Sequence, residues 1–403
     1  MDFKHIIADL VHEELGIEKA RVESIIEIPP DSKLGDYSMP CFMFSKELKK
    51  SPQNIALELK DKLTKINLKE DHKHFELINN VGAYLNFFVN KELYMKNVLH
   101  KVFVDKDEYG KGSHKEEKVM IEHGQANTHK EFHVGHLRNV CLGDSLVRIY
   151  RFNGYNVISA NYPGDIGTHV AKTLWYYLKY HKNDALPLNK GKFLGKMYSE
   201  ASILLEDNPS DESKKEVSEI LQKLENYDPE IHKIWTETRR WSLDQMEEIF
   251  KDLNVKYDVF FFESQVEKDG KKIAKILTDK NLAFENEGAL IIDLKEYKLD
   301  VFLILKSDGT SLYSTKDLAL ALKKFNEYNI DKSYYVVDSR QSMYFQQLFK
   351  TLEIMGFHKD MHHIAYDFVT TKNGAMSSRL GNVILYEELK EKVTQKIFNE
   401  TKQ

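Results

Sequence analysis

The residues best suited to chemistry are His133 and His136, which flank Gly135 shortly after the apolar run at 119–121. A polar turn follows this run, and apolar residues then recur at helical spacing from Leu137 onward, so we predict a strand, a turn and a helix. The first turn of such a helix offers unpaired N–H groups and a positive dipole end, which suit a polyphosphate. Glycine permits close approach of a ligand, and the two imidazoles can donate hydrogen bonds to phosphate oxygens.

Two other interpretations of this histidine pair remain open. The imidazoles, at positions i and i+3, could belong to a metal site, or they could be ordinary surface residues at a helix start. A metal site needs a third and usually a fourth ligand, whereas the chain has no His-Glu-x-x-His sequence and only two, widely separated cysteines. We therefore expect no bound metal. A metal-dependent hydrolase is kept as an alternative, with these candidate ligands: His123, His129, His133 and His136.

Composition limits the class of protein. The 403 residues are enough for two or three domains, and 30% charged with 42% hydrophobic residues is typical of a soluble globular protein. The formal net charge of −5 argues against a generally basic nucleic-acid-coating protein, so any RNA contact has to be local. The two cysteines fit a reducing compartment. Without a signal peptide or a membrane-spanning run, a cytoplasmic location away from membranes is expected.

Residues 1–110 are predicted to form a small α+β domain. Its expected elements are helices over 2–16, 45–50, 52–59 and from 90 to about 102, an extended piece at 24–28, a turn at 33–38 and a strand over 81–89. A charged connector over 105–113 follows.

Residues 114–385 alternate between strand and helix patterns, which predicts a parallel sheet. A second strand at 156–161 leads into a polar turn at 162–169, and ligands of such sheets bind at the carboxyl ends of the strands. We predict a helical insertion at about 182–252. The other expected elements are the return to the fold at 259–265, paired strands at 288–294 and 301–305, strands at 334–338 and 363–368, and helices after 317, 341 and 386.

The sequence His-Val-Gly-His at 133–136 resembles the first signature of class I aminoacyl-tRNA synthetases, and its surroundings resemble an arginyl-tRNA synthetase. The turn at 35–37 and the strand at 82–88 are similar to the domain that contacts the corner of the tRNA in that family. The resemblance implies a Rossmann-like catalytic domain that uses ATP with Mg²⁺, L-arginine and tRNA(Arg) in protein biosynthesis. A monomer is expected.

The resemblance also implies an ATP site. The family's second signature is a lysine-bearing loop, which Ala375-Met376-Ser377-Ser378-Arg379 resembles imperfectly, because Ala375 and Ser378 stand where lysines are usual. Lys130 matches the place of a substitute cation, although it could be a solvated loop lysine. The residues expected to bind ATP are His133, Gly135, His136, Met376, Ser377, Ser378 and Arg379, with His133, His136 and Lys130 in catalytic roles.

A guanidinium is best bound by carboxylates, and the resemblance places Tyr313 and Asp317 in the arginine pocket. From spacing alone, Ser314-Thr315-Lys316-Asp317 is a capping box, and Asp317 would only stabilise a helix start. Asn127, Glu263 and Gln341 also match pocket positions by resemblance.

The family continues beyond the second signature into an anticodon-binding domain, whereas residues 386–403 supply one further helix. We therefore expect a truncated chain or a natural short paralogue. Members of the family need bound tRNA to activate arginine, so impaired charging of tRNA(Arg) is predicted. The alternatives are a class I lysyl-type synthetase and a non-catalytic tRNA-binding paralogue.

Overall fold

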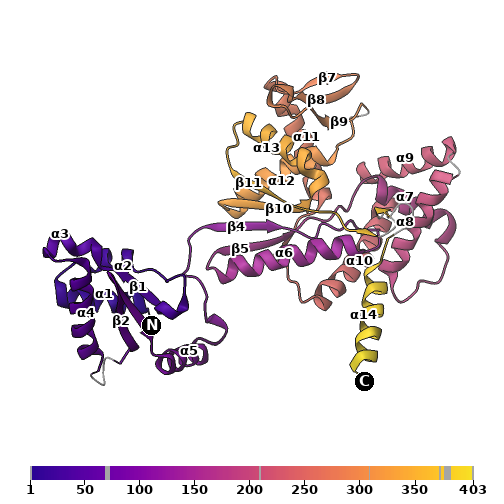
Figure 1. Ribbon diagram of the computed structural model, residues 1–403. Helices are drawn as coiled ribbons and strands as arrows, with labels where there is room; N and C mark the ends of the chain where they lie inside the picture. Colours follow the sequence, from indigo (N-terminus) through magenta and orange to yellow (C-terminus); the bar gives the residue numbers. More distant parts are fainter. Residues whose placement is uncertain are drawn as a thin grey trace. The chain divides into compact units, whose positions relative to one another are not determined.

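The computed structural model divides the chain into two compact units, residues 1–111 and 112–403. It describes residues 2–68, 73–207, 210–307, 309–371, 374–375 and 383–401 (Figure 1). Each unit has its own hydrophobic core and is described by itself.

The first unit is a small α+β domain, as predicted. Its strands β1, β3 and β2 form an antiparallel sheet in that order. Apolar positions of α1 and α4 are buried with Phe44, Phe75 and Phe87. The elements are α1 (Phe3–Leu15), α2 (Lys19–Ile25), β1 (Tyr37–Pro40), α3 (Ser45–Leu48), α4 (Pro52–Asn67), β2 (Phe75–Val81), β3 (Tyr84–Val89) and α5 (Lys91–Asp105).

One local expectation in this unit is wrong, and one strand was not predicted. Residues 24–28 are not an extended piece, because α2 runs to Ile25 and only Glu27 forms a bridge, with Ser38. The strand expected at 81–89 is present as β3, but it is the second half of a hairpin, in which the unpredicted β2 pairs with β3 across a two-residue turn. The polar residues of β2 conceal it in the sequence, since cross-strand pairing rather than alternation fixes this strand.

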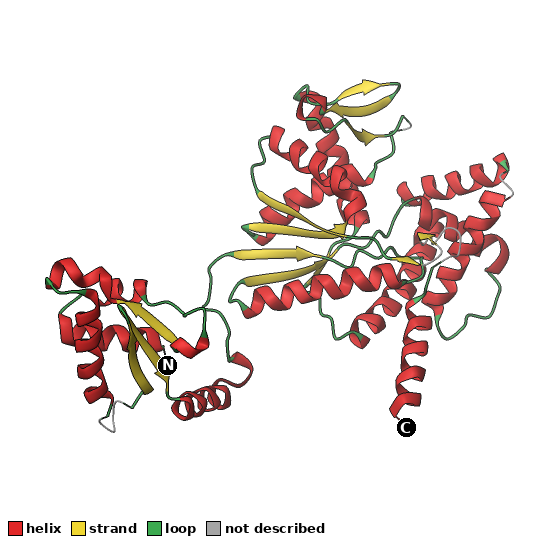
Figure 2. Cartoon of the chain, viewed as in Figure 1, coloured by secondary structure: helices red, strands yellow, loops and turns green. Residues whose placement is uncertain are grey.

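The second unit is built on a five-stranded parallel sheet in the order β11-β10-β4-β5-β6, which confirms the predicted fold class (Figure 2). The chain leaves β4 toward β5 on one side, whereas β10 is followed by β11 on the other. The boundary between β4 and β10 is therefore a topological switch point, where ligands of open parallel sheets bind. The strands are β4 (Lys118–Glu122), β5 (Asn156–Asn161), β6 (Val259–Phe260), β10 (Lys332–Asp338) and β11 (Asp360–Tyr366).

Helices connect these strands, and a second, antiparallel sheet of β7, β8 and β9 lies in the chain between α11 and α12. The predicted pairing of strands near 289 and 303 is confirmed by β8 and β9. The return at 259–265 is a strand only to Phe260, since α11 begins at Glu263. The remaining elements are α6 (Val134–Phe152), α7 (Thr168–Tyr176), α8 (Lys190–Asp207), α9 (Asp211–Glu225), α10 (Pro229–Asp252), α11 (Glu263–Asp279), β7 (Phe284–Asn286), β8 (Ala289–Asp293), β9 (Val301–Leu305), α12 (Tyr313–Tyr328), α13 (Ser342–Ile354), β12 (Thr370–Thr371), β13 (Gly374–Ala375) and α14 (Tyr386–Thr401).

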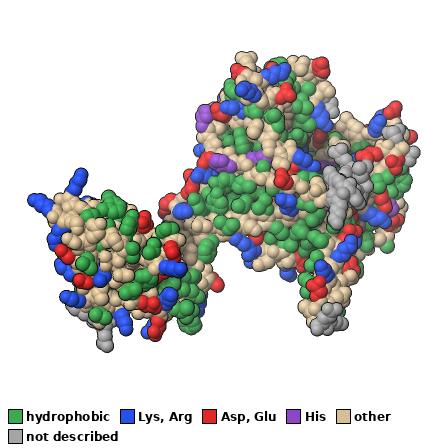
Figure 3. Space-filling view, viewed as in Figure 1, with side chains coloured by type: hydrophobic (Ala, Val, Ile, Leu, Met, Phe, Trp, Pro, Cys, Tyr) green, Lys and Arg blue, Asp and Glu red, His purple; other side chains and the backbone are tan. Residues whose placement is uncertain are grey.

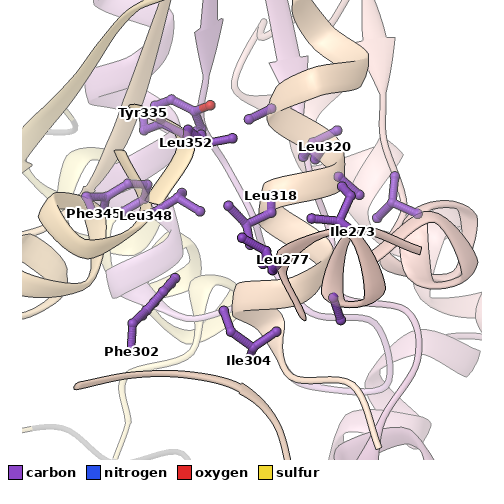
Figure 4. Packing of buried hydrophobic residues seen from close by; sticks show 14 of the residues in the cluster. Ile273, Leu277, Phe302, Ile304, Leu318, Leu320, Tyr335, Phe345, Leu348 and Leu352 are labelled. Atoms are coloured by element: carbon purple, nitrogen blue, oxygen red, sulfur yellow. The ribbon is translucent and has the colours of Figure 1, made fainter. Parts of the chain in front are cut away.

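The largest core of this unit joins α11, α12 and α13 to strands of both sheets. Its side chains point toward one another in Figure 4, and the labelled ones are Ile273, Leu277, Phe302, Ile304, Leu318, Leu320, Tyr335, Phe345, Leu348 and Leu352. This packing fixes the helices that begin at the carboxyl ends of the strands.

The visible surface carries lysine and arginine interspersed with aspartate and glutamate (Figure 3). Neither unit shows one sign of charge alone on this face. Among the described residues, no helix combines the length and the apolar character needed to cross a bilayer.

A buried ion pair ties the sheet to α12. The ammonium group of Lys324 donates to the carboxylate of Glu122 at the end of β4, and their side chains are 0% and 4% exposed. Gln125 donates to the other oxygen of this carboxylate over 2.7 Å, and the ammonium lies 4.0 Å from the ring centroid of Tyr335. Both charges are therefore compensated inside the protein.

Replacing Lys324 by methionine tests this ion pair. Methionine keeps much of the side-chain volume but leaves the Glu122 carboxylate buried without its cation, so we expect the free energy of unfolding to fall by roughly 3–5 kcal/mol. Denaturant unfolding followed by circular dichroism measures the change. The control is Lys323→Met, which removes a partly exposed lysine paired with Glu327 on the same helix; it should cost less than about 1 kcal/mol. Equal losses in both variants would contradict the argument.

Candidate active site

The two histidines of the predicted phosphate site lie together at the start of α6. His133 is the N-cap residue, and its Nδ1 accepts a hydrogen bond from the N–H of Gly135 over 3.1 Å. The backbone N–H of His133 donates to Nδ1 of His136 over 3.3 Å, and the two rings stack with centroids 3.8 Å apart. Because both Nδ1 atoms accept, each neutral ring carries its proton on Nε2.

Burial keeps both imidazoles neutral. Burial and the nearby charge of Lys130 lower the pKa of His133 to about 4. Burial, His133 and Lys130 likewise hold the pKa of His136 well below its ordinary value. At neutral pH the pair therefore offers two N–H donors and no positive charge.

Lys130 is the cation next to this pair. Its charge acts on His133, His136 and His169, and its ammonium lies 4.9 Å from the ring centroid of Tyr198 on α8. The structure thus brings Lys130 beside the histidines, as the resemblance implied, and an aromatic ring from the helical segment between α7 and β6 supports it.

Asn127 and Glu263 meet at Gly164, which follows β5. A Cβ atom on Gly164 would lie 2.3 Å from Oδ1 of Asn127 and 3.0 Å from Oε1 of Glu263, so only glycine leaves room for both. The turn is held by Thr128, whose N–H donates to the Gly164 carbonyl over 2.9 Å. His169 lies 3.3 Å from the same carbonyl oxygen. Two predicted pocket residues therefore converge although they are far apart in the sequence.

Asp165, which lies within the polar turn predicted at 162–169, connects several elements of this unit. Its fully buried carboxylate accepts from Nε of Arg239 over 2.7 Å and from the backbone N–H and hydroxyl of Ser264 over 2.9 and 2.7 Å. Trp235 donates its indole N–H to the Asp165 carbonyl over 2.7 Å. The residue thereby joins α10 to the start of α11.

Asp317 lies among other carboxylates. Burial raises its pKa to about 7; a hydrogen bond from the Tyr344 hydroxyl lowers this pKa, Glu122 and Glu263 raise it, and Lys324 lowers it. Asp317 is thus a carboxyl group whose ionisation the protein itself disfavours at neutral pH.

The neighbouring carboxylates have cations of their own. Glu122 pairs with Lys324, Glu263 with Lys316 over 2.7 Å, and Asp165 with Arg239. Among the ion pairs formed by the part of the chain that the structure describes, none includes Asp317. Asp317 therefore differs from these neighbours in having no cationic side chain of its own among the described residues.

The interpretation of residues 314–317 as a capping box is wrong. Leu312 is the N-cap residue of α12, and its side chain makes no capping hydrogen bond. The hydroxyls of Ser314 and Thr315 donate instead to the carbonyls of Leu303 and Ile304 on β9. Asp317 is therefore not part of a capping box, because the hydroxyls that would form the box donate to β9 instead.

The other predicted pocket residues lie as follows. Tyr313 begins α12 and is 56% exposed, and its ring centroid is 4.8 Å from that of Tyr344. Gln341 is exposed between β10 and α13, and no hydrogen bond among the described residues joins it to the carboxylates. Met376, Ser377, Ser378 and Arg379 lie outside the described residues.

Three residues of this region were missed in the sequence. Tyr162 follows β5 in a turn already assigned to the ligand edge; its buried hydroxyl has no hydrogen-bond partner among the described residues, and burial with Asp317 and Glu263 holds its pKa well above the ordinary value. Lys316 and Tyr344 lie on helices, where periodicity gives no sign of a site.

The four histidines considered as metal ligands do not form one cluster. His123 bonds to Ser159 over 3.0 Å, and both ring nitrogens of His129 contact hydroxyls, those of Thr128 and Thr238, over 2.9 Å. Within the ranges of the chain described above, no three His, Cys, Asp or Glu side chains are grouped to hold a metal ion.

Two family models match the chain. The one described as "tRNA synthetases class I (R), catalytic domain" matches residues 98–403. The one described as "Arginyl tRNA synthetase N terminal domain" matches residues 1–89.

Curated relatives and solved structures agree with these matches. An arginine–tRNA ligase of Bdellovibrio bacteriovorus is 39% identical over 368 residues, which cover 90% of this chain and 62% of that protein. One from Clostridioides difficile is 35% identical over 391 residues, or 96% and 68%. The arginyl-tRNA synthetase structure of Thermus thermophilus has a TM-score of 0.65 at 26% identity and covers 98% of this chain and 69% of that one. The chain thus spans 62 to 70% of the length of its curated relatives.

Nuclear magnetic resonance tests the state of His133. Long-range nitrogen-15 spectra should show its proton on Nε2 at pH 7 and a titration midpoint near 4, because protonation would place a charge in a buried site beside Lys130. His5 is the internal control, since its hydrogen bond with Glu23 and the charge of Asp9 raise its pKa. A midpoint for His133 near the ordinary 6.5, or a proton on Nδ1, would overturn this assignment.

Proposed function

The chain belongs to the class I arginyl-tRNA synthetase family, and from this premise we propose that it activates L-arginine with ATP and transfers the arginyl group to tRNA(Arg). In the first step the arginine carboxylate attacks the α-phosphorus of ATP and pyrophosphate leaves. In the second a ribose hydroxyl of the tRNA attacks the carbonyl of the adenylate and AMP leaves. The observation that carries the proposal is that Asp317 has no cationic partner among the described residues, whereas each neighbouring carboxylate is paired with a lysine or an arginine.

The nucleotide occupies the start of α6 in this proposal. The Nε2–H groups of His133 and His136 donate to phosphate oxygens, Gly135 admits the ligand to the backbone, and the helix dipole favours the negative charge. Lys130 supplies the positive charge that neutral imidazoles cannot. ATP arrives as its Mg²⁺ complex. Catalysis is then positioning and charge neutralisation, without a covalent enzyme intermediate.

Residues 376–379 complete the nucleotide site in this proposal, as the resemblance implies. Their contribution would be contacts to the phosphates, with Arg379 as a second cation.

Arginine binds with its guanidinium toward Asp317 and its backbone toward Asn127. Asp317 supplies the charge, Tyr313 closes the pocket at the start of α12, and Glu263 contributes Oε1, because Lys316 occupies Oε2. Gln341, which lies between β10 and α13, completes the set as the resemblance implies. Residues 1–89, which match the N-terminal domain model, are proposed to contact the tRNA.

Arginine-dependent exchange of pyrophosphate into ATP, with tRNA(Arg) present, tests the activity. We expect exchange with arginine and none with lysine. Exchange with lysine would favour a lysyl-type enzyme, and no exchange together with no ATP binding would favour a non-catalytic module. Aminoacylation of tRNA(Arg) in the same samples checks the weak charging expected from the sequence.

The affinity for arginine should depend on pH. The guanidinium requires an ionised Asp317, whose pKa in the free protein is about 7. Below pH 7 a proton must leave on binding, so the dissociation constant should rise by up to about tenfold per pH unit as the pH falls. Above pH 7 it should level off. Calorimetric titrations with arginine between pH 5.5 and 8.5 measure this, and a flat profile would contradict it.

Asp317→Asn removes the charge while keeping the shape. We expect arginine to bind about 100-fold more weakly, because the ligand's cation loses its buried partner, with no change in ATP affinity. Glu327→Gln, an exposed change on the same helix, is the control. If both variants bound arginine with equal affinity, Asp317 would not belong to the arginine pocket.

A further inference from the structure

Tyr344 connects two of the residues proposed to recognise arginine. Its hydroxyl donates to Oδ2 of Asp317, and its ring centroid lies 4.8 Å from that of Tyr313 and 5.7 Å from that of Phe302. These contacts join α13 to α12 and β9. Tyr344 also follows Gln341 by three residues, at the first turn of α13.

Packing alone does not require the hydroxyl. Phe345 and Phe349 of the same helix have plain rings, and Tyr344 meets Phe345 edge to face with centroids 5.4 Å apart. A phenylalanine at 344 would make the same ring contacts. In the part of the chain described here, the hydrogen bond of the Tyr344 hydroxyl goes to Asp317.

The hydrogen bond from Tyr344 favours the ionised form of Asp317, whereas other nearby groups disfavour it. The charged and titratable groups that face Asp317 are Glu122 of β4, Glu263 of α11, Lys324 of α12, Tyr344 of α13, Tyr162 after β5, Tyr313 at the start of α12 and Tyr335 of β10. The two glutamates disfavour a further negative charge, and Lys324 is already paired with one of them. The phenol donor therefore offsets part of the repulsion and of the burial.

The hydrogen bond also fixes the direction of the carboxylate. An ionised carboxylate has about four acceptor positions on its two oxygens, so a single donor on Oδ2 leaves the others for a ligand. A carboxylate held in one rotamer loses less conformational freedom when a planar guanidinium binds.

We propose that Tyr344 is a positioning residue for arginine recognition, which holds the carboxylate of Asp317 with its hydroxyl and the ring of Tyr313 with its own ring. This inference rests on the proposed function of the same site. Tyr344 acts through its neighbours and need not touch the reacting atoms.

Tyr344→Phe is the decisive variant, because it removes the donor and keeps the ring. We expect the dissociation constant of arginine at pH 7 to rise roughly tenfold, the loss typical of a hydrogen bond to a charged group. The pH midpoint of arginine binding should move above that of the wild-type protein. The affinity for ATP and the rate at saturating arginine should change little, so the effect appears in KM.

Two further variants separate the hydroxyl from the fold. Tyr328→Phe changes another tyrosine packed against the same core, where its ring meets Phe261, and should leave arginine binding and its pH midpoint unchanged. Tyr344→Leu removes the ring as well and should weaken arginine binding more than Tyr344→Phe. Thermal unfolding of each variant verifies that it is folded.

A double-mutant cycle with Asp317→Asn tests whether Tyr344 affects arginine binding through Asp317. If Tyr344 acts through Asp317, adding Tyr344→Phe to Asp317→Asn should weaken arginine binding much less than it does in the wild-type background. Wild-type protein that binds ATP but not arginine would overturn the proposed function and this inference with it. Arginine binding by the wild type with an unchanged affinity and pH midpoint in Tyr344→Phe would overturn the inference alone.

Discussion

The site depends on how negative charge is compensated at the carboxyl edge of the parallel sheet. A buried carboxylate is costly unless a cation or several donors face it. Glu122, Glu263 and Asp165 each have a cation from a helix, whereas Asp317 has the neutral phenol of Tyr344. Among the described residues, Asp317 is therefore the acid of this group without a cation of its own, and burial, together with Glu122 and Glu263, raises its pKa.

The fold creates this imbalance by bringing distant segments to one edge. The carboxylates come from the ends of β4 and β5 and the starts of α11 and α12, whereas the cations come from α10 and from within α12. Arg239 belongs to the helical segment between α7 and β6, so that segment is part of the charge balance through Asp165. Strand order places the ends of β4 and β10 at the switch point, where the helix that carries the histidines begins.

The proposed nucleotide half of the site balances its charge differently. Its histidines are uncharged, and they donate because their Nδ1 atoms are used by the backbone at the start of α6. Positive charge there comes from Lys130, which an aromatic ring supports. Separating donors from charge allows the histidines to remain buried without a counter-ion, since a neutral imidazole is far less costly to desolvate than an imidazolium.

The sequence by itself determined the parallel sheet, the small preceding domain, the histidine pair at a helix start and the family, because periodicity and short motifs are local properties of the chain. It missed β2 and misread the start of α12, where cross-strand pairing and tertiary hydrogen bonds override local patterns. Only the tertiary structure decided which charges are paired, since Glu122 and Lys324 are 202 positions apart. It also decided that Tyr344 meets Asp317 across two helices, because no sequence spacing encodes a contact between faces that pack only after the chain has folded.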